Sequence, residues 1–317
     1  IPGLQSGASD GQVLTYNSTN GNITLADASG GGGGGGASAI NDLSDAVTYN
    51  SGFSIGLGTG ALANDDSTDN DNTALGYNAL NANTSGQGNV AVGHEAGDSI
   101  TTGQYNTLLG ISAGSGLTTG QQNTLIGRNA GQSKTTGQKN TALGHRALLS
   151  GNNSEETAIG FSCFSERSGH TNAVGLGCQA GQWNEGDNNT AIGYQSCGAY
   201  STSAGNNNVG VGYRALRKVS TGNDNTTLGN QAGEEITTGS NNTVIGNSAA
   251  ASSATVSNEI TLGNASVTSL RIPGLQSGAS DGQVLTYSSS NGNITLADAA
   301  GNGMSRAQST AIALVFS

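Results

Sequence analysis

The hydrophobic positions of the chain recur with a regular period. Short runs of β-branched and aliphatic residues end in a glycine, and polar residues and further glycines separate one run from the next. Residues 106–114 read NTLLGISAG, residues 123–131 read NTLIGRNAG and residues 140–148 read NTALGHRAL. Such runs are typical of short strands that end in a turn. The pattern therefore predicts a repeat protein in which each repeat contributes one strand.

One glycine, which we call the anchor, ends each of these runs. Successive anchors lie 16 to 19 residues apart, and most often 17. The anchors are Gly58, Gly76, Gly93, Gly110, Gly127, Gly144, Gly160, Gly177, Gly193, Gly212, Gly229, Gly246 and Gly263. A glycine permits a tight or positive-φ corner where a Cβ would clash. We expect an all-β, parallel β-solenoid, or β-roll, of about 13 coils of ~17 residues, with equivalent strands about 4.8 Å apart.

Each position relative to the anchor keeps one kind of side chain. The aliphatic stripe, one residue before the anchor, is Leu57, Leu75, Val92, Leu109, Ile126, Leu143, Ile159, Leu176, Ile192, Val211, Leu228, Ile245 and Leu262. A second apolar column, two residues before the anchor, includes Ala74, Ala91, Leu108, Leu125, Ala142, Ala158, Ala191 and Val244. Three residues before the anchor stands a threonine column, for example Thr107, Thr124 and Thr141. Four before it stands an asparagine column of Asn72, Asn89, Asn106, Asn123, Asn140, Asn189, Asn208, Asn225 and Asn242. Stacked asparagines are expected to form side-chain ladders.

The two apolar columns predict self-association. Side chains of a strand alternate between its faces, so the stripe and the second apolar column lie on opposite faces. Apolar residues on both faces indicate that both are buried. One face can line the inside of the coil, but the other needs a partner surface. Because a coil of mostly small residues encloses little apolar volume, we expect several rods to pack side by side.

A second duplication lies outside the solenoid. Residues 1–30 and 272–301 match at 27 of 30 positions, and each copy reads as two strands joined by a polar turn. The predicted organisation is a β-hairpin module, a glycine-rich linker, the solenoid shaft, a duplicated β-hairpin module and a tail. The corresponding ranges are 1–29, 30–39, 40–270, 271–301 and 302–317.

Composition narrows the class further. The 317 residues include 53 glycines and only 4% aromatic residues, too few large side chains for an ordinary globular core. The net charge is −11 and the basic residues are scattered, which argues against binding to nucleic acid. No apolar run of about 20 residues is present, so we expect no membrane insertion. The first ten residues lack the charged and apolar regions of a signal peptide.

The amino-acid pattern of the repeats resembles that of two kinds of protein. NTAIGY at 189–194 and NTALGYNAL at 72–80 are similar to the coil repeats of trimeric autotransporter adhesin heads, which are trimers of left-handed parallel β-rolls. LRIPGLQSGASDGQVLTY at 270–287 and DLSDAVTYNSGFSIGLGTGAL at 42–62 resemble more closely the fibre proteins of tailed phages, notably marine and cyanobacterial ones. The period of 17 is longer than that of the adhesins, and no heptad stalk is present.

The resemblance implies an intertwined homotrimer that serves as a structural tail fibre of a virion. Its partners would be itself, other virion or fibre proteins and a glycan or protein receptor on the host surface. The alternative is a bacterial trimeric adhesin head, or a subunit of an extracellular filament joined head to tail through the duplicated modules. An ice-binding solenoid is a third class. It would need a flat Thr-x-Thr face, whereas here we expect the face that carries the threonines to be buried.

No catalytic motif emerges from the sequence, and we expect no enzyme activity and no cofactor. The acidic stretch 64–72 contains Asp65, Asp66, Asp69 and Asp71, whose oxygens are the ligand type that Ca²⁺ prefers. This stretch lacks the spacing of known calcium loops, and these four aspartates are the candidate ligands should a Ca²⁺ ion bind. The adjacent Glu155 and Glu156 are expected to lie on a solvated face.

Receptor contacts are expected near the anchors. The residue after the anchor is often large, as at Tyr77, Tyr194 and Tyr213, and Trp183 lies in an irregular polar stretch. Exposed aromatic residues on a rigid rod could contact a receptor. The alternative is that these side chains pack against neighbouring chains or the next coil.

Overall fold

The computed structural model describes residues 53–66, 70–166, 171–198 and 204–271 together with five further strands. The strands are β1 (Gln12–Tyr16), β2 (Ile23–Asp27), β3 (Ala46–Tyr49), β4 (Ser54–Leu57), β5 (Thr73–Leu75), β6 (Val90–Val92), β7 (Thr107–Leu109), β8 (Thr124–Ile126), β9 (Thr141–Leu143), β10 (Thr157–Ile159), β11 (Val174–Leu176), β12 (Thr190–Ile192), β13 (Val209–Val211), β14 (Thr226–Leu228), β15 (Thr243–Ile245), β16 (Ile260–Leu262), β17 (Gln283–Tyr287) and β18 (Ile294–Asp298). Within the duplicated ends, β1 pairs antiparallel with β2, and β17 pairs antiparallel with β18.

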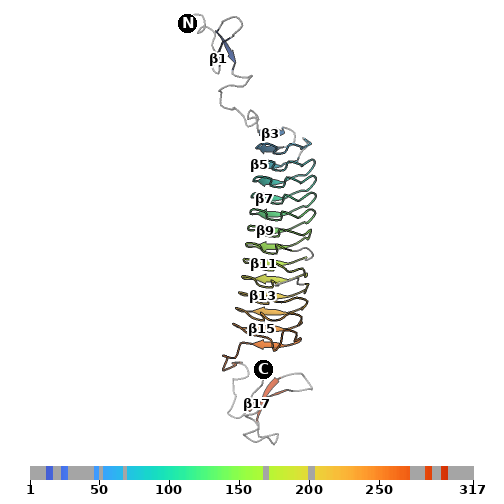
Figure 1. Cartoon of the computed structure of the whole chain (residues 1–317), viewed down its shortest axis with the longest axis vertical. Coiled ribbons are helices and arrows are strands. Elements are labelled where there is room, and N and C mark those ends of the chain that lie inside the picture. Colours follow the sequence, from blue (N-terminus) through green and yellow to red (C-terminus); the bar gives the residue numbers. More distant parts are fainter. Residues whose placement is uncertain are drawn as a thin grey trace.

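The strands from β4 to β16 form one parallel sheet in strict sequence order (Figure 1). Each strand pairs in register with its counterpart in the next coil, so that Thr107 faces Thr124 and Leu108 faces Leu125. The antiparallel strand β3 covers the first edge of this sheet by pairing with β4. The described residues contain no helix. The thirteen parallel strands belong to a β-solenoid of about 12 turns. The predicted all-β solenoid is confirmed.

The anchor glycines form a stack that only glycine can occupy. All thirteen have positive φ, from +83° at Gly263 to +142° at Gly93. A Cβ on Gly127 would lie 2.5 Å from the carbonyl oxygen of Gly144 in the next coil. Backbone therefore packs directly on backbone along the rod, as the sequence predicted for Gly76, Gly93, Gly110, Gly127, Gly144, Gly229 and Gly246.

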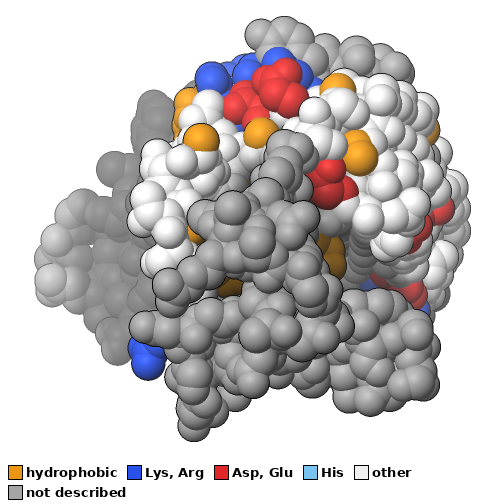
Figure 2. All heavy atoms as spheres, turned by 90° about the horizontal axis from the view of Figure 1, so that it is seen from below, with side chains coloured by type: hydrophobic (Ala, Val, Ile, Leu, Met, Phe, Trp, Pro, Cys, Tyr) orange, Lys and Arg blue, Asp and Glu red, His pale blue; other side chains and the backbone are white. Residues whose placement is uncertain are grey.

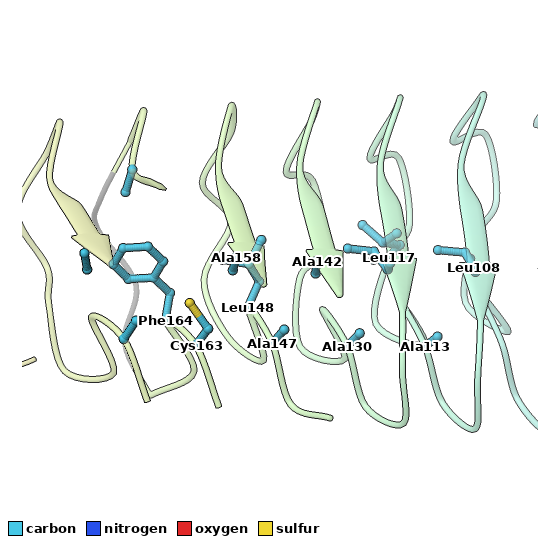
Figure 3. Close-up of a cluster of buried hydrophobic side chains, with 14 of the residues drawn as sticks. Leu108, Ala113, Leu117, Ala130, Ala142, Ala147, Leu148, Ala158, Cys163 and Phe164 are labelled. Atoms are coloured by element: carbon cyan, nitrogen blue, oxygen red, sulfur yellow. The ribbon is translucent and has the colours of Figure 1, made fainter. Parts of the chain in front are cut away.

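The interior of the coil is lined by the second apolar column. Leu108, Leu125, Ala142 and Ala158 are fully buried. Opposite them lies a row of small residues three positions after the anchor, including Ala113, Ala130, Ala147 and Cys163 (Figure 3). The interior is narrow at this position, because the backbone that carries it lies close to the strand. Only a small side chain therefore fits three residues after the anchor.

Large and small residues compensate each other inside each coil. Where the second apolar column holds leucine, as at Leu108, the residue four after the anchor is glycine, and a Cβ on Gly114 would lie 2.9 Å from the Leu108 side chain. Where the column holds alanine, as at Ala142, the later position can hold leucine, as at Leu148. Phe164 is larger still, and the next coil has glycine at both positions, Gly175 and Gly181. Between these two positions, a coil thus has room for about one large side chain.

This compensation gives the first testable prediction. Gly175→Ala should lower the free energy of unfolding by about 2 kcal/mol, because the new Cβ would lie 2.6 Å from the Phe164 ring and 2.4 Å from Cys163 Sγ. Adding Phe164→Leu should recover part of the loss, since Leu148 already lies one coil before Ala158 in this chain. Chemical denaturation of the two single variants and the double variant measures the coupling. Additive effects would contradict the packing described here.

The asparagine column forms two buried hydrogen-bonded ladders, as predicted. In the first, the backbone N–H and the Nδ2 of Asn106 donate to Asn89 Oδ1 at 3.1 and 2.9 Å. The same Nδ2 donates to the carbonyl oxygen of Gly120 at 2.9 Å. The ladders run from Asn72 to Asn140 and from Asn189 to Asn242, because Glu156 and Ala173 occupy the two positions between them. Every polar atom of a central asparagine is thereby paired, which buried amides require.

A charge placed inside a ladder should be poorly tolerated. Asn123→Asp replaces the Nδ2 that donates to Asn106 Oδ1 and to the Gly137 carbonyl with an oxygen. Three oxygens would then meet in a buried site. We expect the free energy of unfolding to fall by about 3 kcal/mol at neutral pH. Asn230→Asp, at an exposed asparagine, is the matched control and should change stability little. Equal melting temperatures for the two variants would contradict the ladder.

Candidate functional site

The outer face of the parallel sheet carries the threonine column and the aliphatic stripe. Both columns point away from the coil interior, because the second apolar column between them points inward. Leu75, Leu109, Leu143, Leu176 and Leu228 are 44 to 48% exposed, and the remaining members of the stripe that lie between β4 and β16 are exposed or half-buried. The threonine face is therefore accessible in the single chain, and its burial against partner chains stays a prediction. A solenoid of narrow bore hides only one face of its sheet.

This outer face is uniform along the rod. Twelve steps of about 4.8 Å carry the stripe over roughly 58 Å, and no charged residue interrupts either column in β5 to β16. Soluble monomers rarely expose a continuous apolar surface of this length. The stripe is the feature of the described residues that most clearly needs a covering surface.

Aromatic side chains form stacks beside the anchors. The Tyr77 and His94 rings have centroids 5.0 Å apart, and the Tyr194 and Tyr213 rings have centroids 5.5 Å apart with 12° between their planes. Arg214 lies 5.0 Å from the centre of the Tyr213 ring. Each stack joins consecutive coils, so the rings cover one another's faces along the rod. The predicted contact residues Tyr77, Tyr194 and Tyr213 are exposed, at 49, 38 and 41%.

Trp183 lies in a different part of the coil from these tyrosines. It is half-buried in a turn between Gly181 and Asn184. Asn184 orders this turn, because its Nδ2 donates to the Cys197 carbonyl at 3.3 Å and its Oδ1 accepts from the Gly186 N–H at 2.9 Å. The four predicted contact residues are therefore spread along the rod and do not form one cluster.

The acidic stretch begins with a carboxylate that caps the first ladder. Asp65 is buried, and its two oxygens accept Nδ2 hydrogens from Asn70, Asn72 and Asn83 at 3.1 to 3.4 Å. Both oxygens of the carboxylate thus accept hydrogen bonds from side-chain amides. Asp66 and Asp71 are exposed, and Asp69 lies outside the described residues. Among the described residues no three His, Cys, Asp or Glu side chains are grouped to hold a metal ion.

The two adjacent glutamates have opposite environments. Glu155 is exposed and lies 3.1 Å from Lys139 Nζ. Glu156 occupies an asparagine-column position inside the coil, where its Oε2 lies 2.8 Å from Lys134 Nζ, and neither side chain is accessible. The expectation that both lie on a solvated face is wrong for Glu156. Its position four residues before the anchor was the signal that could have revealed this.

Other charged residues form ion pairs between neighbouring coils. Lys218 lies 2.6 Å from Glu235, and Arg217 lies 3.3 Å from Glu234, in each case between neighbouring coils. Figure 2 shows basic and acidic side chains gathered together at one edge of the end-on view, while most of the visible described surface is neither charged nor hydrophobic. These pairs support coil stacking and do not form a single-sign surface.

The fold defines a class of protein: a rod-shaped β-solenoid with one flat face of threonine and aliphatic side chains. No helix among the described residues is long and apolar enough to cross a membrane. Comparison of the chain with protein-family models, curated proteins and solved structures finds no match.

Proposed function

We propose that the chain is a structural fibre protein whose solenoids assemble as a homotrimer through the threonine column and the aliphatic stripe. The exposure of the stripe along the whole sheet carries this proposal. A flat face of β-branched and aliphatic residues is self-complementary, so three copies around an axis can cover it with each other. The similarity of residues 72–80 and 189–194 to the repeats of trimeric adhesin heads selects three copies.

The particular assignment that we favour is a tail fibre of a tailed phage. A stack of hydrogen-bonded coils is stiff, and a stiff rod suits a protein that holds a receptor-binding surface away from a particle. The stacked tyrosines and Trp183 are the candidate contacts for a glycan or protein receptor on the host. This function requires no catalysis and no cofactor, and release of reducing sugars from host polysaccharide would contradict it.

Immunogold electron microscopy of the native source separates this assignment from its alternative. Label on the tails of virions would support the phage fibre. Label on bacterial surfaces, or along uniform filaments, would instead support the adhesin head or the head-to-tail filament. The position of the label tests the location of the protein and not its oligomeric state. A labelled cell surface would overturn the virion location and would not contradict the trimer.

Ice binding requires a separate test, because the threonine column is exposed in the single chain. The adjacent column is aliphatic, so the face is Thr-x-Leu or Thr-x-Ile and not a regular pair of hydroxyl rows. Burial of the stripe in a trimer would also remove the face from contact with ice. We therefore expect no thermal hysteresis from the purified protein.

A further inference from the structure

Lys134 and Glu156 form a fully buried pair whose placement breaks the pattern of the repeat. Lys134 stands seven residues after its anchor, where the two preceding coils have the buried apolar residues Ile100 and Leu117. Its Nζ lies 2.8 Å from Glu156 Oε2, and neither side chain is accessible to solvent. A buried ion pair adds little stability on balance relative to apolar residues of similar size. A gain in stability therefore does not explain why this coil has a buried ion pair where the preceding coils have apolar residues.

A primary carboxamide completes the group. Asn153 Nδ2 lies 3.5 Å from Glu156 Oε1, while Lys134 Nζ is held by Oε2 of the same carboxylate. Lys134 Nζ also donates to the backbone carbonyls of Gly151 and Asn153 at 3.1 and 3.3 Å. One carboxylate thus holds an amine on one oxygen and a carboxamide beside the other. This is the arrangement in which a general acid–base group can transfer an acyl group to an amine.

We propose that Lys134 and Asn153 form an intrachain isopeptide bond, with Glu156 as the catalytic proton carrier. The Lys134 ammonium gives a proton to Glu156, and the neutral amine then attacks Asn153 Cγ. The C=O electron pair moves to Oδ1, and Glu156 exchanges protons so that the attacking nitrogen loses one and Nδ2 gains one. The Cγ–Nδ2 bond breaks as the carbonyl re-forms. The products are an Nζ–Cγ amide and ammonia, and no oxidant or co-reactant is consumed.

The surroundings favour this reaction. Hydrogen bonds hold Lys134 Nζ against Glu156 Oε2 at 2.8 Å and against the backbone carbonyl of Asn153 at 3.3 Å, so the amine is kept beside the residue that bears the carboxamide. Burial of Lys134 and Glu156 keeps bulk water away from the amine and the carboxylate, while Asn153 is half-buried. The exposed pair of Lys139 and Glu155, one residue away from the asparagine column in neighbouring coils, has the same charges without this enclosure.

The cross-link would lie where the backbone pairing of the solenoid is interrupted. In the preceding coils the Thr118 N–H donates to the Thr135 carbonyl, whereas the Thr135 N–H donates to the side-chain oxygen of Asn152 at 2.6 Å. Side chains thus replace a backbone carbonyl at this step of the rod. A covalent bond between residues 134 and 153 would hold these two coils together. The inference does not depend on the proposed fibre function.

Denaturing mass spectrometry of the purified full chain tests the proposal. We expect a mass lower than that of the sequence by about 17 Da, the mass of ammonia, and a protease-resistant linked peptide that contains Lys134 and Asn153. Glu156→Gln should restore the full mass, while Lys139→Met should keep the loss. Peptide mapping of the wild-type protein decides whether the Lys134–Asn153 bond is present, even if the Glu156 variant does not fold.

Two results would overturn the proposal. A full-length mass with Lys134 freely acetylated in denaturant would mean that Lys134 and Glu156 are an ion pair only. A loss of about 18 Da, mapped to residues 134 and 156, would mean that Glu156 itself is the acyl group and that Asn153 has no such role.

Discussion

Replacement of two stripe leucines by glutamate, Leu109→Glu with Leu143→Glu, will convert the assembled protein to monomers. These side chains are 46 and 45% exposed in the single chain, so their loss should leave the coil intact. In a trimer the same two changes place six carboxylates in an apolar interface. Burial of unpaired charge is strongly unfavourable, and we expect association to weaken by at least about 3 kcal/mol, more than a hundredfold.

Light scattering and circular dichroism on the same sample separate assembly from folding. The double variant should keep the β spectrum and lose the trimer mass. Tyr105→Glu is the matched control, because Tyr105 is 57% exposed and lies outside the stripe and the threonine column. A double variant that remains trimeric would show that the stripe is not the interface.

Substitution of a single anchor glycine should damage the solenoid more than substitution of most core residues. In Gly127→Ala the new Cβ would lie 2.5 Å from the Gly144 carbonyl oxygen, at a residue whose φ is +129°. Alanine can relieve neither the clash nor the backbone strain, because the obstacle is the main chain of the next coil. We expect the free energy of unfolding, measured by chemical denaturation, to fall by at least about 3 kcal/mol.

A second glycine provides the control for this experiment. Gly198 has no positive φ, and a Cβ there would have its nearest contact at 3.2 Å. Gly198→Ala should therefore destabilise the fold much less than Gly127→Ala. Equal effects at Gly127 and Gly198 would mean that the anchor stack is not the constraint that we describe.

The period, the strands, the anchor corners and the asparagine ladders could all be predicted from the sequence. Each depends on a local pattern that recurs in every coil, and stacking identical residues determines their contacts. The direction of the strand faces could not be predicted by alternation alone, because both Leu109 and Leu108 are apolar. The size exchange between Leu108 and Gly114 was a usable signal, since only an enclosed position requires such compensation.

The single departures from the repeat were harder to interpret. The acidic residue before Glu156 predicts a surface position for it, yet its register places it in the asparagine column beside Lys134. The acidic neighbours of Asp65 predict an exposed carboxylate, yet its side chain is buried and caps a ladder. In both cases the position within the coil decided the environment, and the local composition did not.

The mass of the native protein in solution tests the central claim most directly. Sedimentation equilibrium should give about 94 kDa, three times the 31.2 kDa of one chain. A soluble, fully folded monomer of 31.2 kDa would contradict the account, because the aliphatic stripe would then face water along the whole rod.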